Sequence, residues 1–248
     1  MTTCSTDPDH LPIVGDELVV LAEMVELSNQ SIIELGCGSA RLSRGLLQRY
    51  PGCSVTGLEV DAIQHAKNLS RPQERLEFVA AGAQSIPFES KSFDLALMLK
   101  SLHHVPIDMM DQGLNDVARV LRPRGFLYVS EPIYGGSLNE IVRLYNDEGV
   151  VRLAAQAALN RAIEKKTNWE QIDERRFSQA VHFASFDEFV TRMLYPSFTD
   201  HEIDEEIIQR VRKAFEPHLR ASGATFVRPM HVRLVQRTAY EVAAMDLC

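Results

Sequence analysis

Two acidic residues and a pair of glycines, spaced over residues 34–59, carry the groups that a nucleoside-binding site needs. Glu34 precedes Gly36 and Gly38, and Glu59 follows the second glycine by roughly twenty residues. Two glycines one residue apart permit a tight turn and let a ligand approach bare backbone. A carboxylate at the later position can accept hydrogen bonds from ribose hydroxyls. The spacing therefore predicts a site for a nucleoside-containing cofactor.

The glycine turn also excludes two common kinds of nucleotide site. A dinucleotide fingerprint, G-x-G-x-x-G, needs a third glycine at the position where this chain has Arg41. The Gly-Lys-Ser/Thr ending of a Walker loop is absent as well. The pattern that remains is E-x-G-x-G, followed by a second acid.

Short apolar runs place this turn between a strand and a helix. Residues 32–35 are an apolar run typical of a buried parallel strand. The leucines that follow mark one face of a helix ending near Tyr50, with Ser39 as its expected N-cap. A second strand over 54–58 delivers Glu59 at its carboxyl end. Strand, glycine turn, helix, strand and acid form the first half of a nucleotide-binding α/β unit.

The whole arrangement resembles the class I S-adenosylmethionine (SAM)-dependent methyltransferases. Within them it is most similar to the small-molecule branch (methyltransferase type 11) that includes the ubiquinone and menaquinone C-methyltransferases. The resemblance covers roughly residues 32–133. It implies SAM as cofactor and S-adenosylhomocysteine as product. It also implies an α/β fold with a Rossmann-like, seven-stranded, mainly parallel sheet in the order 3-2-1-4-5-7-6, helices on both faces and a helical lid insertion.

The resemblance also implies how the cofactor is held. In the family the acid before the turn reaches the methionine amino group, and a segment written G-D-A-x-x-L-P-F holds adenine. Here that segment is 81–88 and has Gly82 in place of the acid, so the Gln84 side chain or the Ala83 backbone would replace one polar contact. The expected cofactor-binding residues are Glu34, Gly36, Cys37, Gly38, Arg41, Glu59, Val60, Gly82, Ala83, Gln84, Lys100 and Ser101.

The acceptor is expected beside the end of the fourth strand. Parallel α/β sheets bind ligands beyond the carboxyl ends of their strands, where the strand order reverses. The implied order puts this point between the first and fourth strands, and the apolar run 92–99 is the expected fourth strand. Residues 100–106 should therefore line the site.

Two histidines in this segment, His103 and His104, are the main candidates for a general base. His104 is slightly preferred, Tyr134 after the fifth strand is the third candidate, and Glu131 and His182 rank behind. A base is needed only if the acceptor is a poorly ionised oxygen or a carbon acid. The alternative, in which the histidine pair is a hydrogen-bonded loop element, stays open. A metal site on the two histidines is not expected, because no ligand spacing supports it.

Composition favours a cytoplasmic enzyme that acts on small molecules. The chain has 248 residues, a net charge of −8 and 45% hydrophobic residues. The negative charge disfavours a nucleic-acid partner, as does the absence of an N/D/S-P-P-aromatic motif after residue 99. We see no apolar run long enough to span a membrane, no signal-peptide pattern and no paired cysteines. The expected partner is a small-molecule methyl acceptor. A homodimer is a possible oligomeric state.

The chain is expected to divide into three parts. These are a SAM-binding core over 1–136, a helical lid or substrate-recognition insertion over 137–219, and a closing edge strand with the tail of the core over 220–248. The edge strand is expected over 224–235, and an edge would tolerate Pro229 because it can lose a hydrogen-bond donor.

The expected function is transfer of a methyl group from SAM to a small-molecule acceptor (EC 2.1.1.-). Transfer from a sulfonium is an in-line displacement, so the protein mainly supplies proximity, alignment and exclusion of water. Two alternatives stay open. One is a SAM-binding fold with other cofactor chemistry. The other is a non-catalytic binding module, which stays possible because Gly82 replaces the usual acid of the adenine segment. Cofactor binding and methyl transfer are the observations that separate the three.

Overall fold

One mixed sheet organises the chain in the computed structural model, which describes residues 11–195 and 202–238. Within these residues the strands run in the order β1-β7-β9-β6-β5-β2-β3-β4, with β8 paired to β9. The main strands are β2 (Ser31–Leu35), β3 (Ser54–Leu58), β4 (Leu76–Val79), β5 (Phe93–Leu99), β6 (Leu121–Pro132), β7 (Trp169–Phe183) and β9 (Gly223–Arg237). Counted in chain order, these seven follow the predicted order 3-2-1-4-5-7-6.

Pairing is parallel from β4 through β6 and antiparallel where β9 meets β6 and β7. The sheet is therefore mainly parallel in its cofactor half, as expected. Two short strands, β1 (Ile13–Val14) and β8 (Leu219–Arg220), were not predicted. They extend the sheet beside β7 and β9.

The prediction that the last strand closes the sheet as an edge is wrong. β9 lies between β6 and β7 and pairs with both. Pro229 is tolerated because of where β6 ends. The last β6 pair joins Pro132 to Met230, and the next contact is the Ile133 N–H donating to the Pro229 carbonyl at 2.9 Å. In an antiparallel ladder the N–H and C=O of one residue point to the same neighbouring strand. The nitrogen of Pro229 therefore points toward the β6 side, where β6 has already ended, and no ladder hydrogen bond is lost.

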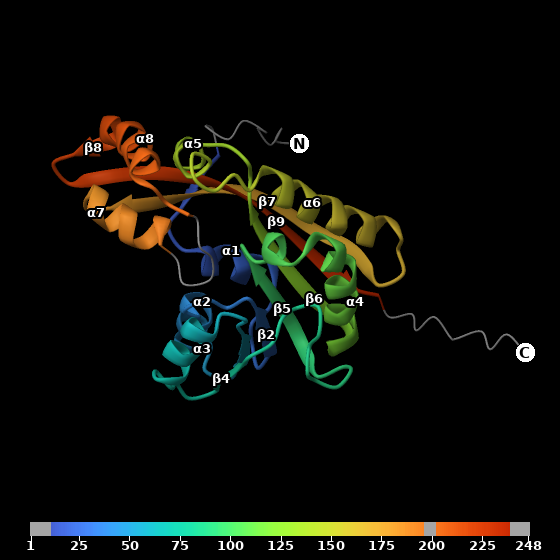
Figure 1. The fold of residues 1–248 in the computed structure, drawn as a ribbon. Coiled ribbons are helices and arrows are strands. Elements are labelled where there is room, and N and C mark those ends of the chain that lie inside the picture. The colour runs from blue at the N-terminus through green and yellow to red at the C-terminus, as the bar shows by residue number, and fades with distance from the viewer. Residues whose placement is uncertain (1–10, 196–201, 239–248) are drawn as a thin grey trace, which may run out of the picture.

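Helices cover both faces of the sheet (Figure 1). On one face, α4 (Met110–Val120) and α6 (Gly149–Glu164) bury apolar side chains against β5 and β6. On the other, α1 (Glu17–Met24) and α2 (Arg41–Arg49) pack on β2 and β3. Helix α3 (Ala62–Leu69) packs beside β4. The central strands are apolar on both faces because both faces are covered.

Helices α3 and α2 differ in how they are capped. Asp61 caps α3, because its side chain accepts from the Ile63 N–H at 2.9 Å. The expected cap of α2, Ser39, does not cap it. The helix begins one residue later, after Ala40, which adopts a left-handed conformation with φ of 54° and makes no side-chain cap.

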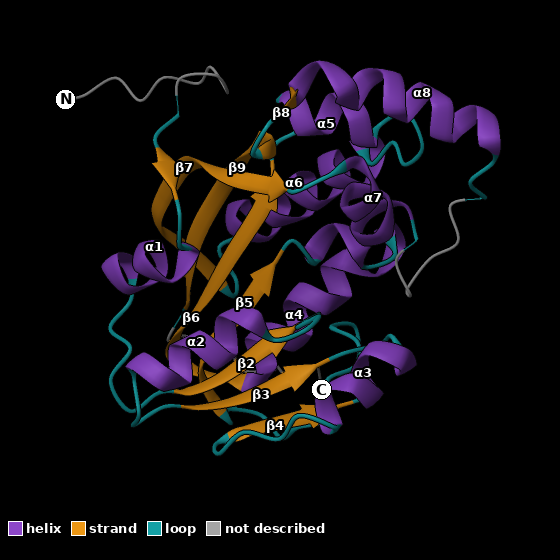
Figure 2. Cartoon of the chain, turned by 90° about the vertical axis from the view of Figure 1, so that its left-hand side faces the viewer, coloured by secondary structure: helices purple, strands orange, loops and turns teal. Residues whose placement is uncertain are grey.

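A second apolar cluster lies at one end of the two longest strands. Helices α5 (Ser137–Val142), α7 (Phe186–Phe189) and α8 (Glu205–Phe215) gather there, as Figures 1 and 2 show. A π-helical turn, η4 (Val190–Leu194), follows α7 directly. Phenylalanines from α7, α8, β7 and β9 form the centre of this cluster.

The segment 137–219 therefore contains more than helices, because β7 runs through its middle as a full member of the sheet. Within the described ranges no helix is both long enough and apolar enough to cross a lipid bilayer. The expected tail beyond residue 238 lies outside the described residues.

Candidate functional site

A large cavity opens at the carboxyl ends of β2, β3, β5 and β6. Its volume is about 1520 Å³, more than the roughly 300–1,000 Å³ typical of a site for one small molecule. The twelve expected cofactor-binding residues and both histidines line it, whereas the other candidate bases, Tyr134, Glu131 and His182, do not. Tyr134 lies outside the lining, 41% exposed, and its hydroxyl donates to Asp147 at 2.8 Å, which raises the pKa of the phenol. The structure thus brings the predicted residues together and leaves Tyr134 out.

The glycine turn after β2 forms a bare backbone wall of the cavity. Gly36 has φ of +69°, and a Cβ placed on it would lie 2.8 Å from the Cβ of Ser101. Gly38 has φ of +52°, and a Cβ there would meet nothing within 4 Å. Gly36 is therefore required by close packing against the loop after β5. Gly38 instead leaves open space in which a ligand can approach the backbone.

Glu59 is fixed at the end of β3 by two backbone donors. Its Oε2 accepts from the Gly38 N–H at 2.7 Å, and its Oε1 accepts from the Asp61 N–H at 2.9 Å. The side chain is 7% exposed. Each carboxylate oxygen has a second lone pair, so the group can still accept hydrogen bonds from a pair of hydroxyls in the cavity. Asn68 on α3 supports the same turn by donating to the Gly38 carbonyl at 2.7 Å.

Glu34 is a buried acid beneath the glycine turn. It is 3% exposed and accepts a hydrogen bond from the Ser43 hydroxyl on α2. Burial raises the pKa of Glu34 to about 7, although the Ser43 hydrogen bond and the charge of Lys100 act in the opposite direction. A buried carboxylate without a full countercharge is costly. The position is therefore suited to a ligand that brings a positive charge.

Gln84 fills the space above Gly82 in the expected adenine segment. A Cβ added to Gly82 would lie 2.5 Å from Oε1 and 2.8 Å from Nε2 of Gln84. Ala83 and Gln84 line the same wall. The Gln84 amide thus occupies the place that an acidic side chain at position 82 would take, and it offers both a donor and an acceptor.

The loop after β5 contributes a second set of polar groups. Lys100 has φ of 58°, and its ammonium lies 3.3 Å from Oε2 of the buried Glu17 on α1. Ser101 is 8% exposed, and its hydroxyl has no hydrogen-bond partner among the described residues. Both line the cavity, so Ser101 holds an unused donor and acceptor at its wall.

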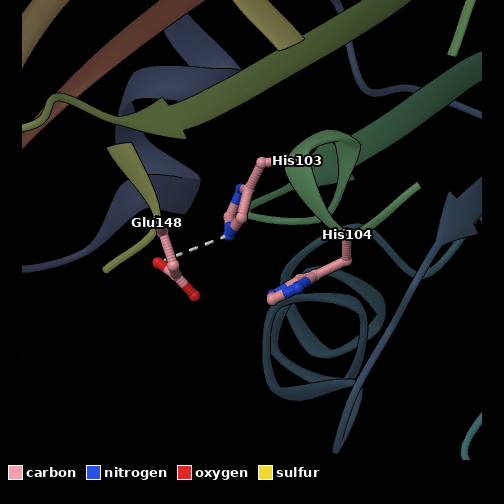
Figure 3. Close-up of side chains that lie close together, drawn as sticks. All are labelled: His103, His104 and Glu148. Atoms are coloured by element: carbon pink, nitrogen blue, oxygen red, sulfur yellow. Dashed lines mark ion pairs between the residues drawn. The ribbon is translucent and has the colours of Figure 1, made fainter. Parts of the chain in front are cut away.

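His103 forms a buried dyad with Glu131. The Nδ1 atom of His103 hydrogen-bonds to Oε2 of Glu131, and the Leu102 N–H donates to Oε1 of the same carboxylate at 2.9 Å. The two side chains are 4% and 1% exposed. A carboxylate at Nδ1 keeps the proton of a neutral imidazole there, which leaves Nε2 as the basic atom. The Nε2 atom faces Glu148, 3.9 Å from its Oε2 (Figure 3).

His104 lies beside this dyad, with its ring centroid 4.1 Å from that of His103. Its pKa is lowered, first because the cavity walls remove solvent and second because His103 lies next to it. Both histidines line the cavity, and His104 is the more exposed of the two. The hydrogen bond to Glu131 fixes the orientation of the His103 ring.

Glu148 connects the histidines to an arginine on α6. Arg152 donates to Oε2 of Glu148 at 2.6 Å and to Oδ1 of Asn139 at 2.9 Å. Burial alone would raise the pKa of Glu148, but the charges of His103 and Arg152 outweigh it and lower the pKa.

His103, His104 and Glu148 offer ligand atoms within 4.8 Å of one another, which could hold a metal ion (Figure 3). However, Glu148 is already paired with Arg152, and this guanidinium charge opposes a dication. The geometry favours a hydrogen-bonding network, and the expected absence of a metal stays a prediction.

Residues 33–129 match a family model described as a methyltransferase domain. The match runs from β2, through the glycine turn, Glu59 and the histidine pair, into β6. Over these residues the chain is similar to a methyltransferase domain. The family resemblance predicted from the sequence is confirmed.

Relatives with curated names match a comparable length of the chain. The fatty-acid O-methyltransferase of Mycolicibacterium smegmatis is 35% identical over 111 residues, which are 43% of this chain and 39% of that protein. The phthiotriol/phenolphthiotriol dimycocerosates methyltransferase 1 of Mycobacterium ulcerans is 33% identical over 115 residues, 44% of this chain and 40% of that protein. The chain thus aligns with about two-fifths of the length of either relative.

The fold extends beyond the methyltransferase domain. The YcgJ protein from Bacillus subtilis superposes with a TM-score of 0.62, over 90% of this chain and 98% of that chain. Its sequence identity is 13%, so the likeness concerns the fold alone.

Several polar residues of the cavity lie outside the methyltransferase domain, and sequence reasoning missed them. Asn139, Glu148, Arg152 and Arg228 come from α5, the start of α6, α6 itself and β9. An acid before a helix and an arginine within one are ordinary in sequence. Arg228 gave only a weak signal, because the same expected strand also contains Arg233.

Proposed function

We propose that the protein transfers a methyl group from SAM to a small-molecule acceptor, with His103 as the general base. The observation that carries the proposal is a single cavity that contains both the Glu34–Gly38–Glu59 cradle and the His103–Glu131 dyad. Bound SAM would supply an activated methyl on a sulfonium, which leaves as neutral S-adenosylhomocysteine. The cavity volume has room for a nucleoside cofactor and an acceptor together.

The cofactor half of the cavity fits each part of SAM. Glu34 would pair with the methionine ammonium, and this interaction would offset the cost of burying the carboxylate. Glu59 would accept from the two ribose hydroxyls with its free lone pairs, while Gly38 leaves the backbone open beside it. Gln84 would replace the usual acid at the adenine edge.

In the acceptor half, His103 would remove the proton that the acceptor loses on methylation. Its Nε2 faces the cavity, and Glu131 would hold the ring in one tautomer and stabilise the imidazolium that forms. This role requires an acceptor oxygen or carbon that is poorly ionised in water. Helices α5 and α6 of the segment 137–219 would shape specificity, since both line this half.

The curated relatives support a small-molecule acceptor. One is named for a fatty acid and the other for phthiotriol and phenolphthiotriol dimycocerosates, and neither name refers to nucleic acid or protein. The cytoplasmic location and the homodimer expected from the sequence stay predictions.

Two measurements on the full chain test the proposal. Titration calorimetry with S-adenosylhomocysteine and, in parallel, with NADH should show binding of the first compound alone. Incubation with methyl-labelled SAM and a panel of fatty acids, hydroxylated lipids and phenols should then show label transfer. Failure to bind S-adenosylhomocysteine would favour a non-catalytic module, whereas binding without transfer would favour other cofactor chemistry.

Affinity for S-adenosylhomocysteine should depend on pH through Glu34. The raised pKa of about 7 means that Glu34 takes up a proton as the pH falls below 7, and only the carboxylate can pair with the ligand's ammonium. The nearest charged groups, Lys100, Glu17 and Glu59, set this balance. Between about pH 7 and pH 5 we expect affinity to fall by up to tenfold per pH unit, measured by calorimetry.

The Glu34→Gln variant is the control for this dependence. It should bind more weakly at pH 8 and lose most of the pH dependence, because the amide does not titrate. An unchanged affinity of the parent chain from pH 7 to pH 5 would show that Glu34 does not hold the ammonium.

A further inference from the structure

Arg228 is an arginine at the cavity wall without an ion-pair partner among the described residues. It lies on β9 opposite Gln179 of β7 and lines the cavity, with its side chain partly buried. No hydrogen bond or ion pair to its guanidinium exists among the described residues. An arginine with five donors directed at no partner, in an interior strand, is unfavourable without a ligand.

A second unused donor lies in the same cavity. Asn139 on α5 is 7% exposed, and its Oδ1 accepts from Arg152. The Nδ2 amide of Asn139 has no hydrogen-bond partner within the described ranges. Because Arg152 is paired with Glu148, the charges of these two cancel. The carboxylates of Glu148 and Glu17 act on Arg228 but neither forms an ion pair with it, because each is already paired with another cation, Arg152 and Lys100 respectively.

Much of the cavity wall that the neighbouring elements contribute is apolar. Ile133, Leu138, Val142, Val151 and Met193 line the cavity on this side, from the end of β6, α5, α6 and η4. An occupant that fits both the Arg228 guanidinium and the apolar wall has an apolar body and one negative charge. This end is also adjacent to the reacting groups, because Arg152 contacts Glu148, which faces Nε2 of His103.

We propose that Arg228 anchors a carboxylate of the methyl acceptor, with the Asn139 amide as a second donor. The acceptor is then an amphipathic monocarboxylate. A guanidinium matches the planar carboxylate with two parallel hydrogen bonds. A phosphate monoester, which carries nearly two charges near neutral pH, would leave one of them uncompensated here. The inference rests on the proposed function, since it names the acceptor class of the same site.

Calorimetry on the full chain saturated with S-adenosylhomocysteine tests the anchor. The probes are octanoate, octyl phosphate and octan-1-ol, which share the alkyl chain and differ in the head group. The parent chain should bind octanoate more tightly than the other two. Arg228→Gln should weaken octanoate binding by roughly tenfold to a hundredfold, and Arg228→Lys should weaken it less. Both variants should bind S-adenosylhomocysteine as the parent does.

Arg161→Gln is the control, because Arg161 is an arginine on α6 that pairs with Asp111 at the surface and does not line the cavity. It should leave octanoate binding unchanged. The anchor is refuted if Arg228→Gln binds octanoate as the parent does, if either other probe binds as tightly, or if octanoate does not bind. Those outcomes leave binding of S-adenosylhomocysteine intact, whereas loss of that binding in the parent contradicts the proposed function itself.

Discussion

Replacing Glu59 with alanine is expected to weaken binding of S-adenosylhomocysteine by about a hundredfold. The carboxylate would make the ribose contacts, and it also holds the Gly38 and Asp61 N–H groups at 2.7 and 2.9 Å. Loss of hydrogen bonds to a charged acceptor costs about 1.5–3 kcal/mol. Because Gly38 would lose its anchor as well, the effect should lie toward the upper end. Titration calorimetry of the purified variant measures it.

Glu77→Ala is the matched control for this prediction. Glu77 is an acid on the neighbouring strand β4, exposed and outside the cavity lining, so its loss should leave affinity unchanged. Circular dichroism and thermal unfolding should show that both variants keep the fold. If Glu59→Ala bound the ligand within twofold of the parent, the carboxylate would not be the ribose acceptor.

The cofactor half could be predicted from sequence because its signals are local. The run before Gly36 is apolar on both faces, as a central parallel strand must be. The expected length of the next strand places Glu59 directly after its last residue. The Asp61 cap of α3 is also a local signal. Once these elements are fixed, parallel pairing places their carboxyl ends, and therefore Glu59 and Gly38, at one edge of the sheet.

The other half depends on contacts between distant segments, which leave weak local signals. The first part of β7 is rich in charged residues because one of its faces is largely exposed, so the sequence gives no strand signal there and the segment was expected to be helical. β9 was expected at an edge, since Pro229 removes a donor, and only the end of β6 shows why an interior position is allowed. Tyr134 was expected in the site from its place after β6, but its side chain lies at the surface against Asp147.

Replacing His103 with alanine should lower kcat by about 10²- to 10⁴-fold, the usual contribution of a general base. Glu131 hydrogen-bonds to Nδ1 of His103, and this bond leaves Nε2 as the basic atom in the cavity. Glu131→Gln should lower kcat less, because the amide can still contact Nδ1 but does not stabilise an imidazolium. The measurement uses the acceptor found with methyl-labelled SAM, at saturating concentrations of both substrates.

His104→Ala decides between the two histidines, because the sequence slightly favoured His104 and the geometry favours His103. His104 is exposed to the cavity and its pKa is lowered, so it is less often protonated but also a weaker base. We expect its loss to reduce kcat by less than tenfold while S-adenosylhomocysteine binding stays unchanged in both variants. A kcat for His103→Ala within twofold of the parent would remove the base role. A large loss in His104→Ala alone would transfer that role to His104, and Glu131 would then serve only to hold the turn after β5.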